Sequence, residues 1–425
     1  MIYFCVYDVF FFIFILFFFP YIWKRIKPDK IFPFGWKERF GIYDIDVIRK
    51  LRKKKNIWFQ TVSVGELLSI TPLIRIMREK FPDENIILTV TTKTGRKIAL
   101  KEFPDIPCLF FPFDFSVIVK RAIKFLNPKL IILVETEIWP NLFRISFNKK
   151  IPFLIINGRV SPKSFSRYKK FKFFIKKVVS LPDEIIMRTK EESKRIIYLG
   201  AKKEKVTVLG SIKFDQAFLL SEKINPNKIR QMYSIPENKK IVVFGSIHPG
   251  EEKPIVEIAK KMLKTNSDIT IVIVPRFLDK TNIFKILNEE KIPYAKKSNL
   301  EGNQNLPVWV IDTYGELNNF YSICDIAFVG GSLIPWGGQN PIEPAAFKKP
   351  VIFGKYNWHF FEEWEKIKNN KGGIEVNDFQ QLYQKISFLL DNPSFAREIG
   401  EKAFTTILEN KDTTIKILSI IKKYF

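Results

Sequence analysis

The sequence predicts an α/β protein of two domains, each built around a parallel β-sheet, with an apolar helix at the N-terminus. The chain has 425 residues, more than one compact core of ordinary size holds. Short β-branched segments alternate with helical periodicity along most of that length, which favours parallel sheets covered by helices. A hydrophobic fraction of 46% is typical of a globular protein and argues against a disordered chain.

Residues 2–22 are almost wholly apolar and predict a membrane-anchor helix over residues 1–25. A stretch of this length matches a hydrocarbon layer of ~30 Å, and no small-residue cleavage site follows it. Asp8 is its only charged residue, and Pro20 interrupts it, so a helix lying in the membrane interface is the alternative. Basic residues come directly afterwards, which by the positive-inside rule predicts cytoplasmic domains. They are Lys24, Arg25, Lys27 and Lys30.

The net charge of +26 calls for an anionic partner or a composition bias of the genome, and the two explanations stay open. We find no signature of a nucleic-acid-binding fold and expect no nucleic-acid partner. An anionic membrane surface accounts for the charge more simply, since an apolar N-terminal segment is present. Cys5, Cys108 and Cys324 lie far apart and there are two histidines, so no zinc cluster and no metal is expected.

Two series of strands are predicted, one in each half of the chain. The first comprises Ile57–Val62, Asn85–Thr91, Cys108–Phe111, Leu130–Val134, Phe153–Ile156, Glu184–Met187 and Val206–Leu209. The second comprises Lys240–Gly245, Ile269–Val274, Val308–Ile311, Ile326–Val329 and Val351–Phe353. Residues 222–238 are polar, contain two prolines and predict a linker, which leaves Rossmann-like domains at 26–221 and 239–425. Ligands of such sheets bind at the carboxyl ends of the strands, facing a cleft between the two halves.

Residues 63–66 read Ser-Val-Gly-Glu and follow the first predicted strand directly. Gly65 permits a tight turn beside Ser63, and Glu66 then begins a helix with its carboxylate at the end of the strand. Taken alone, this carboxylate is better explained as an acidic residue in the first turn of a helix, where the macrodipole favours negative charge.

A second acidic segment makes a functional interpretation stronger. A buried apolar strand runs straight into Glu135 and Glu137, and no structural reason for the paired carboxylates is evident. Residues 157–161 read Asn-Gly-Arg-Val-Ser after the next strand and place Arg159 at the same edge. Residues 162–180 then carry seven basic side chains and no acidic one, interleaved with aromatic residues, which favours contact with a membrane or lipid phosphate over a simple solvated face.

In the second half, three segments predict an anion-binding site. Residues 245–252 read Gly-Ser-Ile-His-Pro-Gly-Glu-Glu and present free N–H groups at a helix start, without a GxGxxG or Walker pattern. Arg276 ends the next strand and suits bidentate phosphate binding. Residues 330–344 form a Gly-rich turn with a carboxylate in the following helix. The candidate nucleotide-binding residues are Gly245, Ser246, His248, Arg276, Gly331, Ser332, Asn340 and Glu343.

These segments, in this order and spacing, resemble the 3-deoxy-D-manno-octulosonic acid (Kdo) transferases of lipopolysaccharide assembly. The likeness runs from residues 34–41 (Phe-Gly-Trp-Lys-Glu-Arg-Phe-Gly) to about Trp364. An N-terminal anchor in the inner membrane, followed by the GT-B glycosyltransferase architecture on the cytoplasmic side, fits this family. The contact with anionic lipid is expected from the basic residues and not from the resemblance. The resemblance implies CMP-Kdo as donor, the lipid A precursor (lipid IVA) as acceptor and inversion at the anomeric carbon. No cofactor is implied.

The resemblance also implies roles for individual residues. Glu66 matches the position of the general base that deprotonates the acceptor 6′-hydroxyl, and Glu137 is preferred to Glu135 as the second carboxylate. Arg276, with the turn at residues 245–246 and Asn340, would hold the CMP phosphate without a metal, and Glu343 would hold the ribose. The sequence departs from the family pattern at Phe277 and Gln339, where histidine is usual, and in residues 354–360.

Two other functions stay open at this point. One is a GT-B transferase that uses a UDP-sugar in envelope biosynthesis. The other is a non-catalytic, membrane-bound protein that binds lipopolysaccharide.

Overall fold

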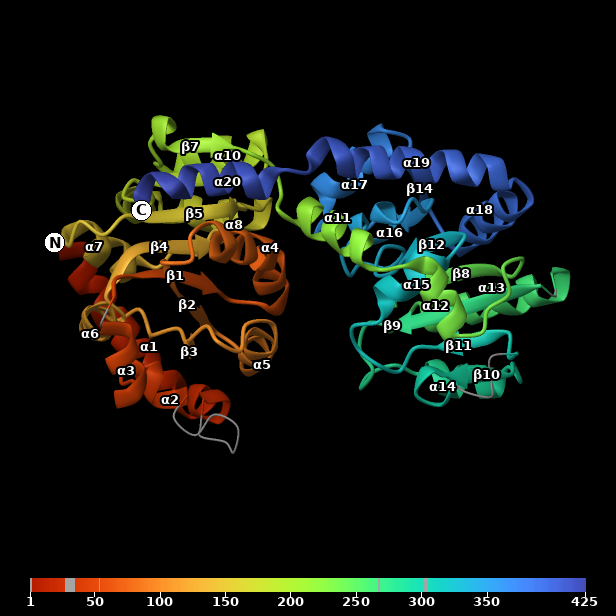
Figure 1. Ribbon diagram of the computed structural model, residues 1–425, viewed down its shortest axis with the longest axis horizontal. Coiled ribbons are helices and arrows are strands. Elements are labelled where there is room, and N and C mark those ends of the chain that lie inside the picture. The colour runs from red at the N-terminus through yellow and green to blue at the C-terminus, as the bar shows by residue number, and fades with distance from the viewer. Residues whose placement is uncertain (1, 27–34, 53, 267, 301–304) are drawn as a thin grey trace. The chain divides into compact units, whose positions relative to one another are not determined.

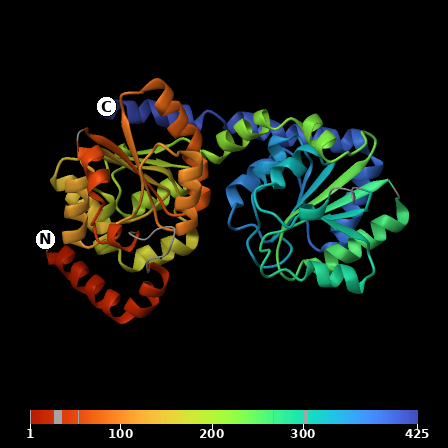
Figure 2. The ribbon, with the colours of Figure 1, turned by 60° about the horizontal axis from the view of Figure 1, so that its bottom comes forward.

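The computed structural model describes residues 2–26, 35–52, 54–266, 268–300 and 305–425. Two α/β units make up the chain, and each contains a seven-stranded parallel sheet with helices on its outer faces (Figures 1 and 2). Unit 1 comprises Met1–Ile212 and Asp412–Phe425, and unit 2 comprises Lys213–Lys411. The two-domain α/β prediction is therefore confirmed.

The sheet of unit 1 has the strand order β3-β2-β1-β4-β5-β6-β7. Its strands are β1 (Asn56–Thr61), β2 (Asn85–Val90), β3 (Cys108–Phe110), β4 (Pro128–Val134), β5 (Phe153–Gly158), β6 (Glu184–Met187) and β7 (Val206–Val208). Its helices are α1 (Ile2–Ile26), α2 (Gly35–Glu38), α3 (Ile45–Arg52), α4 (Val64–Lys80), α5 (Lys93–Glu102), α6 (Ser116–Leu126), α7 (Pro140–Asn148), α8 (Pro162–Lys170), α9 (Lys172–Val179), α10 (Lys190–Leu199) and α20 (Thr413–Ile421).

The sheet of unit 2 has the order β10-β11-β9-β8-β12-β13-β14. Its strands are β8 (Lys240–Ile247), β9 (Ile269–Pro275), β10 (Tyr294–Lys296), β11 (Val308–Val310), β12 (Ile326–Val329), β13 (Val351–Gly354) and β14 (Gly373–Val376). Its helices are α11 (Lys213–Lys223), α12 (Pro226–Met232), α13 (Glu252–Thr265), α14 (Ile283–Glu289), α15 (Leu317–Ile323), α16 (Ile342–Ala346), α17 (Phe361–Asn369), α18 (Phe379–Asp391) and α19 (Pro393–Asn410).

All twelve predicted strands are present, with ends displaced by no more than two residues. The central strands β1, β4, β8 and β9 are buried along most of their length, which is why they read as continuous apolar runs. The strands β10 and β14 were not predicted from the sequence. Both are short edge strands, and polar or glycine residues within them hide the β pattern.

The boundaries of the units differ from the predicted ones. Residues 222–238 are not a free linker, because α12 forms there and Ile229, Tyr233 and Ile235 enter a core of unit 2. The C-terminal helix α20 belongs to unit 1, where Ile417 and Ile421 join the core beneath β1 and β4. Figure 1 shows α20 lying against this unit. The apolar face of α20 is buried in unit 1, and sequence periodicity cannot reveal which domain covers such a face.

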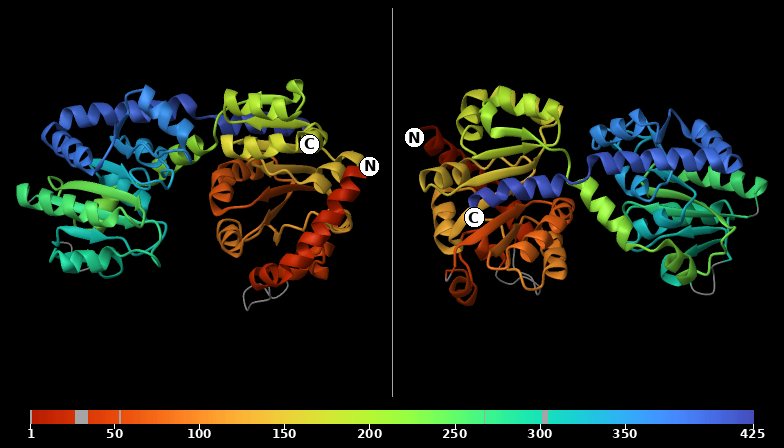
Figure 3. Two further views of the ribbon diagram at one scale, coloured as in Figure 1. Left: turned by 180° about the vertical axis from the view of Figure 1, so that it is seen from behind. Right: turned by 45° about the horizontal axis from the view of Figure 1, so that its top comes forward.

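The helix α1 covers the predicted anchor, and one of its faces packs on unit 1 (Figure 3). Phe4 is buried, and its ring lies 5.8 Å from that of Phe174 in α9. Asp8 accepts hydrogen bonds from the Ser116 N–H (3.1 Å) and the Asn141 amide (2.7 Å). The single charged side chain of the segment is therefore hydrogen-bonded to α6 and α7. Within the described residues, we find no helix whose length and apolar character suffice to cross a membrane, which leaves the predicted span unsupported.

Candidate functional site

The predicted site residues follow the strands on either side of the switch point of each sheet. In unit 1, β1 pairs with both β2 and β4. From β1 the following strands are added toward one edge of the sheet, and from β4 toward the other, so the switch point lies between β1 and β4. In unit 2 the same reversal occurs between β8 and β12. Open α/β sheets bind ligands at the carboxyl ends of such strands. Each unit therefore presents one candidate region.

The carboxylate of Glu66 is held in the first turn of α4. The Ser63 hydroxyl accepts the Glu66 N–H (3.2 Å) and donates to Glu66 Oε1 (3.0 Å), while Oε2 accepts the Val62 N–H (2.6 Å). This is a reciprocal capping box, so Glu66 does stabilise the helix start as the structural alternative expected. Each carboxylate oxygen has a second lone pair, and the side chain is only partly buried, so a further hydrogen bond remains available.

Two further carboxylates follow β4. Glu135 has a left-handed backbone conformation with φ +63°, which is uncommon for a residue other than glycine. Its N–H donates to the Ile156 carbonyl at the end of β5 (2.9 Å). Backbone strain of this kind gathers at functional sites, where the surrounding structure has to enforce it. Glu137 is partly buried, and its Oε2 is a buried oxygen without a hydrogen-bond partner.

Burial and neighbouring negative charge raise the pKa of two of these carboxylates, Glu137 and Glu66. Burial raises the pKa of Glu137 to about 7, with the charges of Glu66 and Glu135 adding to the effect. Burial and the neighbouring charge of Glu135 also raise the pKa of Glu66, against the hydrogen bonds from Val62 and Ser63. A carboxylate whose pKa approaches neutrality is a better proton acceptor at physiological pH. The cluster can therefore remove a proton from a bound hydroxyl group.

The third polar segment of unit 1, residues 157–161, stabilises the loop that carries Glu135 and Glu137. The Arg159 N–H donates to the Thr136 hydroxyl between the two glutamates (2.8 Å). Asn157 is buried with φ +53°, and its side-chain oxygen accepts the Ile212 N–H (3.3 Å). The predicted rim residue Arg159 thus fixes the carboxylate loop through its backbone.

In unit 2, the turn after β8 is tightly constrained. A side chain at position 245 would come within 1.9 Å of the Tyr321 hydroxyl, so only glycine fits there. Ser246 has φ +53°, and the pairing of β8 with β9 shifts its register between Phe244 and Ile247. This bulge redirects the backbone at the carboxyl end of the strand.

His248 is a buried member of this turn. Its Nδ1 lies 3.0 Å from the Ser246 carbonyl and its Nε2 lies 3.3 Å from the Gln339 amide nitrogen. Burial lowers the pKa of His248, so the neutral ring with a proton on Nδ1 fits both contacts. Gln339, which departs from the family pattern, donates a hydrogen bond to this ring. Phe277, the other departure, packs edge-on to it at 5.4 Å between ring centroids.

Glu251 joins the two loops of unit 2, and the sequence analysis assigned it no role. It is fully buried, and its Oε2 accepts the N–H groups of His248 (2.9 Å) and Gly331 (2.7 Å). Burial raises its pKa to about 7, although backbone N–H groups of both loops oppose the shift. The sequence offered one sign of this role, namely the two adjacent glutamates that end residues 245–252. Such a pair is unusual at the start of a helix with a buried face.

Two predicted nucleotide-binding residues have structural roles. The N–H of Gly331 is used by Glu251, so it is not free for a phosphate. Ser332 is fully buried, and its hydroxyl donates to the Val329 carbonyl (2.6 Å) and accepts the Gly354 N–H (2.9 Å). The Ser332 hydroxyl thus stabilises the β12–β13 edge, and a contact of Ser332 with the nucleotide stays a prediction.

The remaining predicted residues of unit 2 lie near one another. The Asn340 side chain donates to Glu343 Oε1 (3.1 Å) and accepts the Ile342 N–H (3.2 Å). Burial raises the pKa of Glu343, and the positive charge of Arg276 opposes that rise. Arg276 is exposed, and its backbone N–H donates to the Ile247 carbonyl beside the β8 turn (2.8 Å). The guanidinium is thus available beside a turn rich in backbone amides.

In the described part of the chain, no group of three or more His, Cys, Asp or Glu side chains has a metal-binding arrangement.

The architecture is shared with solved structures of low sequence identity. A glycosyltransferase from Rickettsia africae ESF-5 superimposes with a TM-score of 0.59 and 20% identity, over 87% of this chain and 98% of that one. The UDP-GlcNAc 2-epimerase from Neisseria meningitidis gives a TM-score of 0.61 and 14% identity, over 87% and 100%. These likenesses concern the fold, which is the two-domain GT-B type.

Sequence comparisons narrow the class. Residues 35–216 match the family described as 3-deoxy-D-manno-octulosonic-acid transferase (kdotransferase). The 3-deoxy-D-manno-octulosonic acid transferase of Haemophilus influenzae is 32% identical over 91% of this chain and 90% of its own. That of Rickettsia bellii is 28% identical over 92% of each chain. The chain belongs to the Kdo transferase family, and it is a glycosyltransferase of lipopolysaccharide biosynthesis.

Proposed function

We propose that this protein transfers Kdo from CMP-Kdo to the 6′-hydroxyl of the lipid A precursor, with inversion at the anomeric carbon. The observation that carries the proposal is the cluster of Glu66, Glu135 and Glu137 after β1 and β4. Membership of the Kdo transferase family supports the identity of the transferred sugar.

The acid–base step is assigned to Glu66. The acceptor hydroxyl oxygen forms a bond to the anomeric carbon while the bond from that carbon to the CMP phosphate breaks. The hydroxyl proton passes to the Glu66 carboxylate, whose pKa is raised by burial and by Glu135. Glu137, with a pKa of about 7, keeps the local proton affinity high at neutral pH. The leaving CMP takes up the electron pair.

Unit 2 supplies the electrostatic stabilisation of the leaving group. Negative charge develops on the CMP phosphate, and the exposed guanidinium of Arg276 beside the Ser246 turn meets it. Asn340 and Glu343 already form a hydrogen-bonded pair that suits a ribose hydroxyl. This arrangement operates without a metal ion, so EDTA should leave turnover unchanged.

The test is incubation of purified protein with CMP-Kdo and lipid A precursor, followed by mass analysis of the lipid. We expect the mass of the lipid to rise by one or more Kdo units, and CMP to protect the protein against heating more strongly than UDP does. Transfer from a UDP-sugar alone would replace the proposal with the UDP-sugar alternative. A protein that binds lipopolysaccharide with no transfer, and with binding unaffected by Glu66→Gln, would be non-catalytic.

We also propose that α1 holds the protein on an anionic inner-membrane surface with both units on the cytoplasmic side. Phe10 and Phe17 on the outer face of α1 are 66% and 81% exposed, whereas Phe4 and Asp8 bind unit 1. Phe173 in the basic segment α9 is also exposed and lies 6.0 Å from Tyr3 of α1. Exposed aromatic rings beside basic residues are typical of helices that lie in a membrane interface.

Flotation with phosphatidylglycerol–phosphatidylethanolamine vesicles tests this attachment. Phe10→Ser/Phe17→Ser should strongly reduce vesicle binding, while Phe388→Ser/Phe395→Ser, which removes two exposed aromatic rings from unit 2, should not. Neutralising Lys169, Lys170 and Lys172 together should lower the bound fraction at low salt and make the remaining binding less sensitive to salt. Equal flotation of the wild type and the α1 variant would contradict the proposal.

A further inference from the structure

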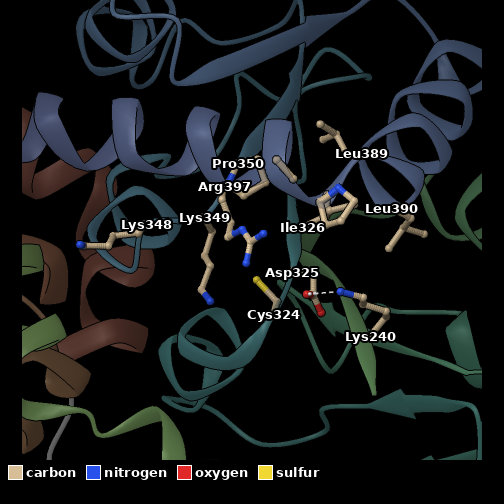
Figure 4. A pocket seen from close by; sticks show the side chains of 12 residues that line it. Lys240, Cys324, Asp325, Ile326, Lys348, Lys349, Pro350, Leu389, Leu390 and Arg397 are labelled. Carbon is tan, nitrogen blue, oxygen red and sulfur yellow. Dashed lines mark hydrogen bonds and ion pairs between the residues drawn. The ribbon is translucent and has the colours of Figure 1, made fainter. Parts of the chain in front are cut away.

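A cavity of about 250 Å³ lies at the edge of the unit 2 sheet opposite the candidate site. It adjoins the amino ends of β8 and β12, at Lys240 and Ile326, whereas Ser246 and Gly331 follow the carboxyl ends of the same strands. Helices α18 and α19 complete its wall through Leu389 and Arg397 among others (Figure 4). The position separates this cavity from the predicted nucleotide-binding residues by the length of the strands.

Three of the charged residues around the cavity are engaged within the fold. Asp325 Oδ2 accepts the Ile241 N–H (2.8 Å), and its Oδ1 lies 3.4 Å from the ammonium of Lys240. Asp325 therefore ties the amino ends of β8 and β12 together, with Lys240 as its counterion. Lys348 pairs with Glu401 at 3.1 Å. None of these groups needs a ligand.

Lys349 and Arg397 differ from them. Among the described residues, neither has a carboxylate partner, and Asp325 is the one carboxylate that lines the cavity. In Figure 4 the Arg397 guanidinium ends above Cys324, and the Lys349 side chain runs down beside it. Two neighbouring cations without a counterion repel each other, and an anion between them would relieve this repulsion.

The other walls are apolar. Ile326 and Leu389 are buried residues of the sheet and of α18, and Pro350, directly before β13, also lines the cavity. The Cys324 thiol at the floor is neutral, because burial raises its pKa to about 12. A ligand with one charged end and one apolar end therefore matches the surface.

We propose that this cavity binds a small phosphate monoester, with the phosphate between Lys349 and Arg397 and the carbon part against Ile326 and Leu389. A monoester carries close to two negative charges at pH 7, which matches the two unpaired cations. The guanidinium can bind two phosphate oxygens at once, and the lysine adds a point charge. The volume is below the ~300–1,000 Å³ of drug-sized ligand sites, which restricts the ester to a small one.

Calorimetric titration of the full-length protein with phenyl phosphate and with inorganic phosphate tests the proposal. We expect saturable binding of phenyl phosphate, and several-fold weaker binding of inorganic phosphate, which lacks the apolar part. Lys349→Ala/Arg397→Ala should weaken phenyl phosphate binding at least about tenfold. Binding that does not saturate, or equal affinity for both probes, would overturn the proposal.

Two control variants locate the site. Lys97→Ala/Lys416→Ala removes two exposed lysines of unit 1 and the same net charge, and it should leave the affinity unchanged. Arg276→Ala alters the predicted nucleotide-phosphate site and should also leave it unchanged. Loss of binding in either control, or its retention in Lys349→Ala/Arg397→Ala, would refute the assignment. Unaltered melting temperatures of the variants would show that each one folds.

Discussion

The two sheets have equivalent switch points, yet the chemistry at their carboxyl ends is opposite. After β1 and β4, unit 1 gathers the carboxylates Glu66, Glu135 and Glu137, and burial and neighbouring negative charge raise the pKa of Glu66 and Glu137. In unit 2, the exposed guanidinium of Arg276 at the end of β9 lies beside the turn that follows β8. On our proposal, the same strand arrangement supports a proton-accepting region in one unit and an anion-binding region in the other.

The difference arises from where one glutamate lies in each turn. Glu66 follows its helix start by two residues and turns back to cap it, with its carboxylate at the surface of the turn. Glu251 precedes its helix and points beneath the turn, where it accepts N–H groups from two loops. The carboxylate of Glu66, at the surface of its turn, can still contact a ligand. The carboxylate of Glu251, buried beneath its turn, holds two loops together.

Glu66→Gln should give the largest effect and tests the unit 1 side of the comparison. The amide retains most of the capping geometry but cannot take up a proton, so kcat should fall by about 10²–10⁴-fold. Steady-state kinetics with CMP-Kdo and lipid A precursor measure this change. CMP binding and the melting temperature serve as controls and should remain near the wild-type values. Near-normal turnover would remove Glu66 from the mechanism.

Glu251→Ala tests the unit 2 side. It leaves the buried N–H groups of His248 and Gly331 without an acceptor, at about 1–3 kcal/mol each. We expect the free energy of unfolding to fall by about 3 kcal/mol and CMP affinity to fall at least about tenfold. Chemical denaturation and calorimetry give the two quantities. Lipid acceptor binding should be preserved, and an unchanged CMP affinity would show that the two loops do not need this carboxylate.

Arg276→Ala should weaken CMP binding by about ten- to a hundredfold, because a charge-assisted bidentate contact to phosphate contributes roughly 1.5–3 kcal/mol. Arg276→Lys should recover only part of this loss, since an ammonium lacks the planar fork. Calorimetric titration with CMP and with cytidine separates the phosphate contribution from that of the nucleoside. Equal losses for both ligands would place Arg276 away from the phosphate.

Glu137→Gln should have the smallest effect, and it concerns stability. Because the folded-state pKa is raised to about 7, the folded protein binds this proton more tightly than the unfolded chain does. The free energy of unfolding of the wild type should therefore fall as pH rises from about 4.5 to 7. The variant should match the wild type near pH 4.5 and exceed it by about 1–2 kcal/mol at pH 8. Parallel pH profiles from denaturant titrations would contradict the raised pKa.

The predicted elements show where sequence patterns are sufficient. The buried strands β1, β4, β8 and β9 are continuous apolar runs, and such runs reveal a parallel sheet directly. Edge strands such as β14 lack this signal, since one side meets no further strand and tolerates glycine and charge. Helix α20 follows unit 2 along the chain, so its place in the sequence gave no sign that it packs in the core of unit 1.

The candidate sites follow the same rule. Glu66, Glu135 and Glu137 were predicted because charges directly after apolar strands stand out in the sequence. The roles of Glu251 and Ser332 were not, because hydrogen bonds to His248 and Gly331, or to Val329 and Gly354, join segments distant along the chain. Both side chains are polar and lie near glycines, so the sequence alone does not separate a ligand contact from an internal one.

The sequence by itself determined the two parallel sheets, the positions of most strands and the family, because apolar periodicity and motif spacing are local properties of the chain. Only the tertiary structure decided which side of each turn a carboxylate occupies and which unit covers the last helix. It also decided that Asp8 is hydrogen-bonded within unit 1. These outcomes depend on which distant groups a side chain meets once the strands have paired. Burial and hydrogen-bond geometry then fix the chemistry of each residue.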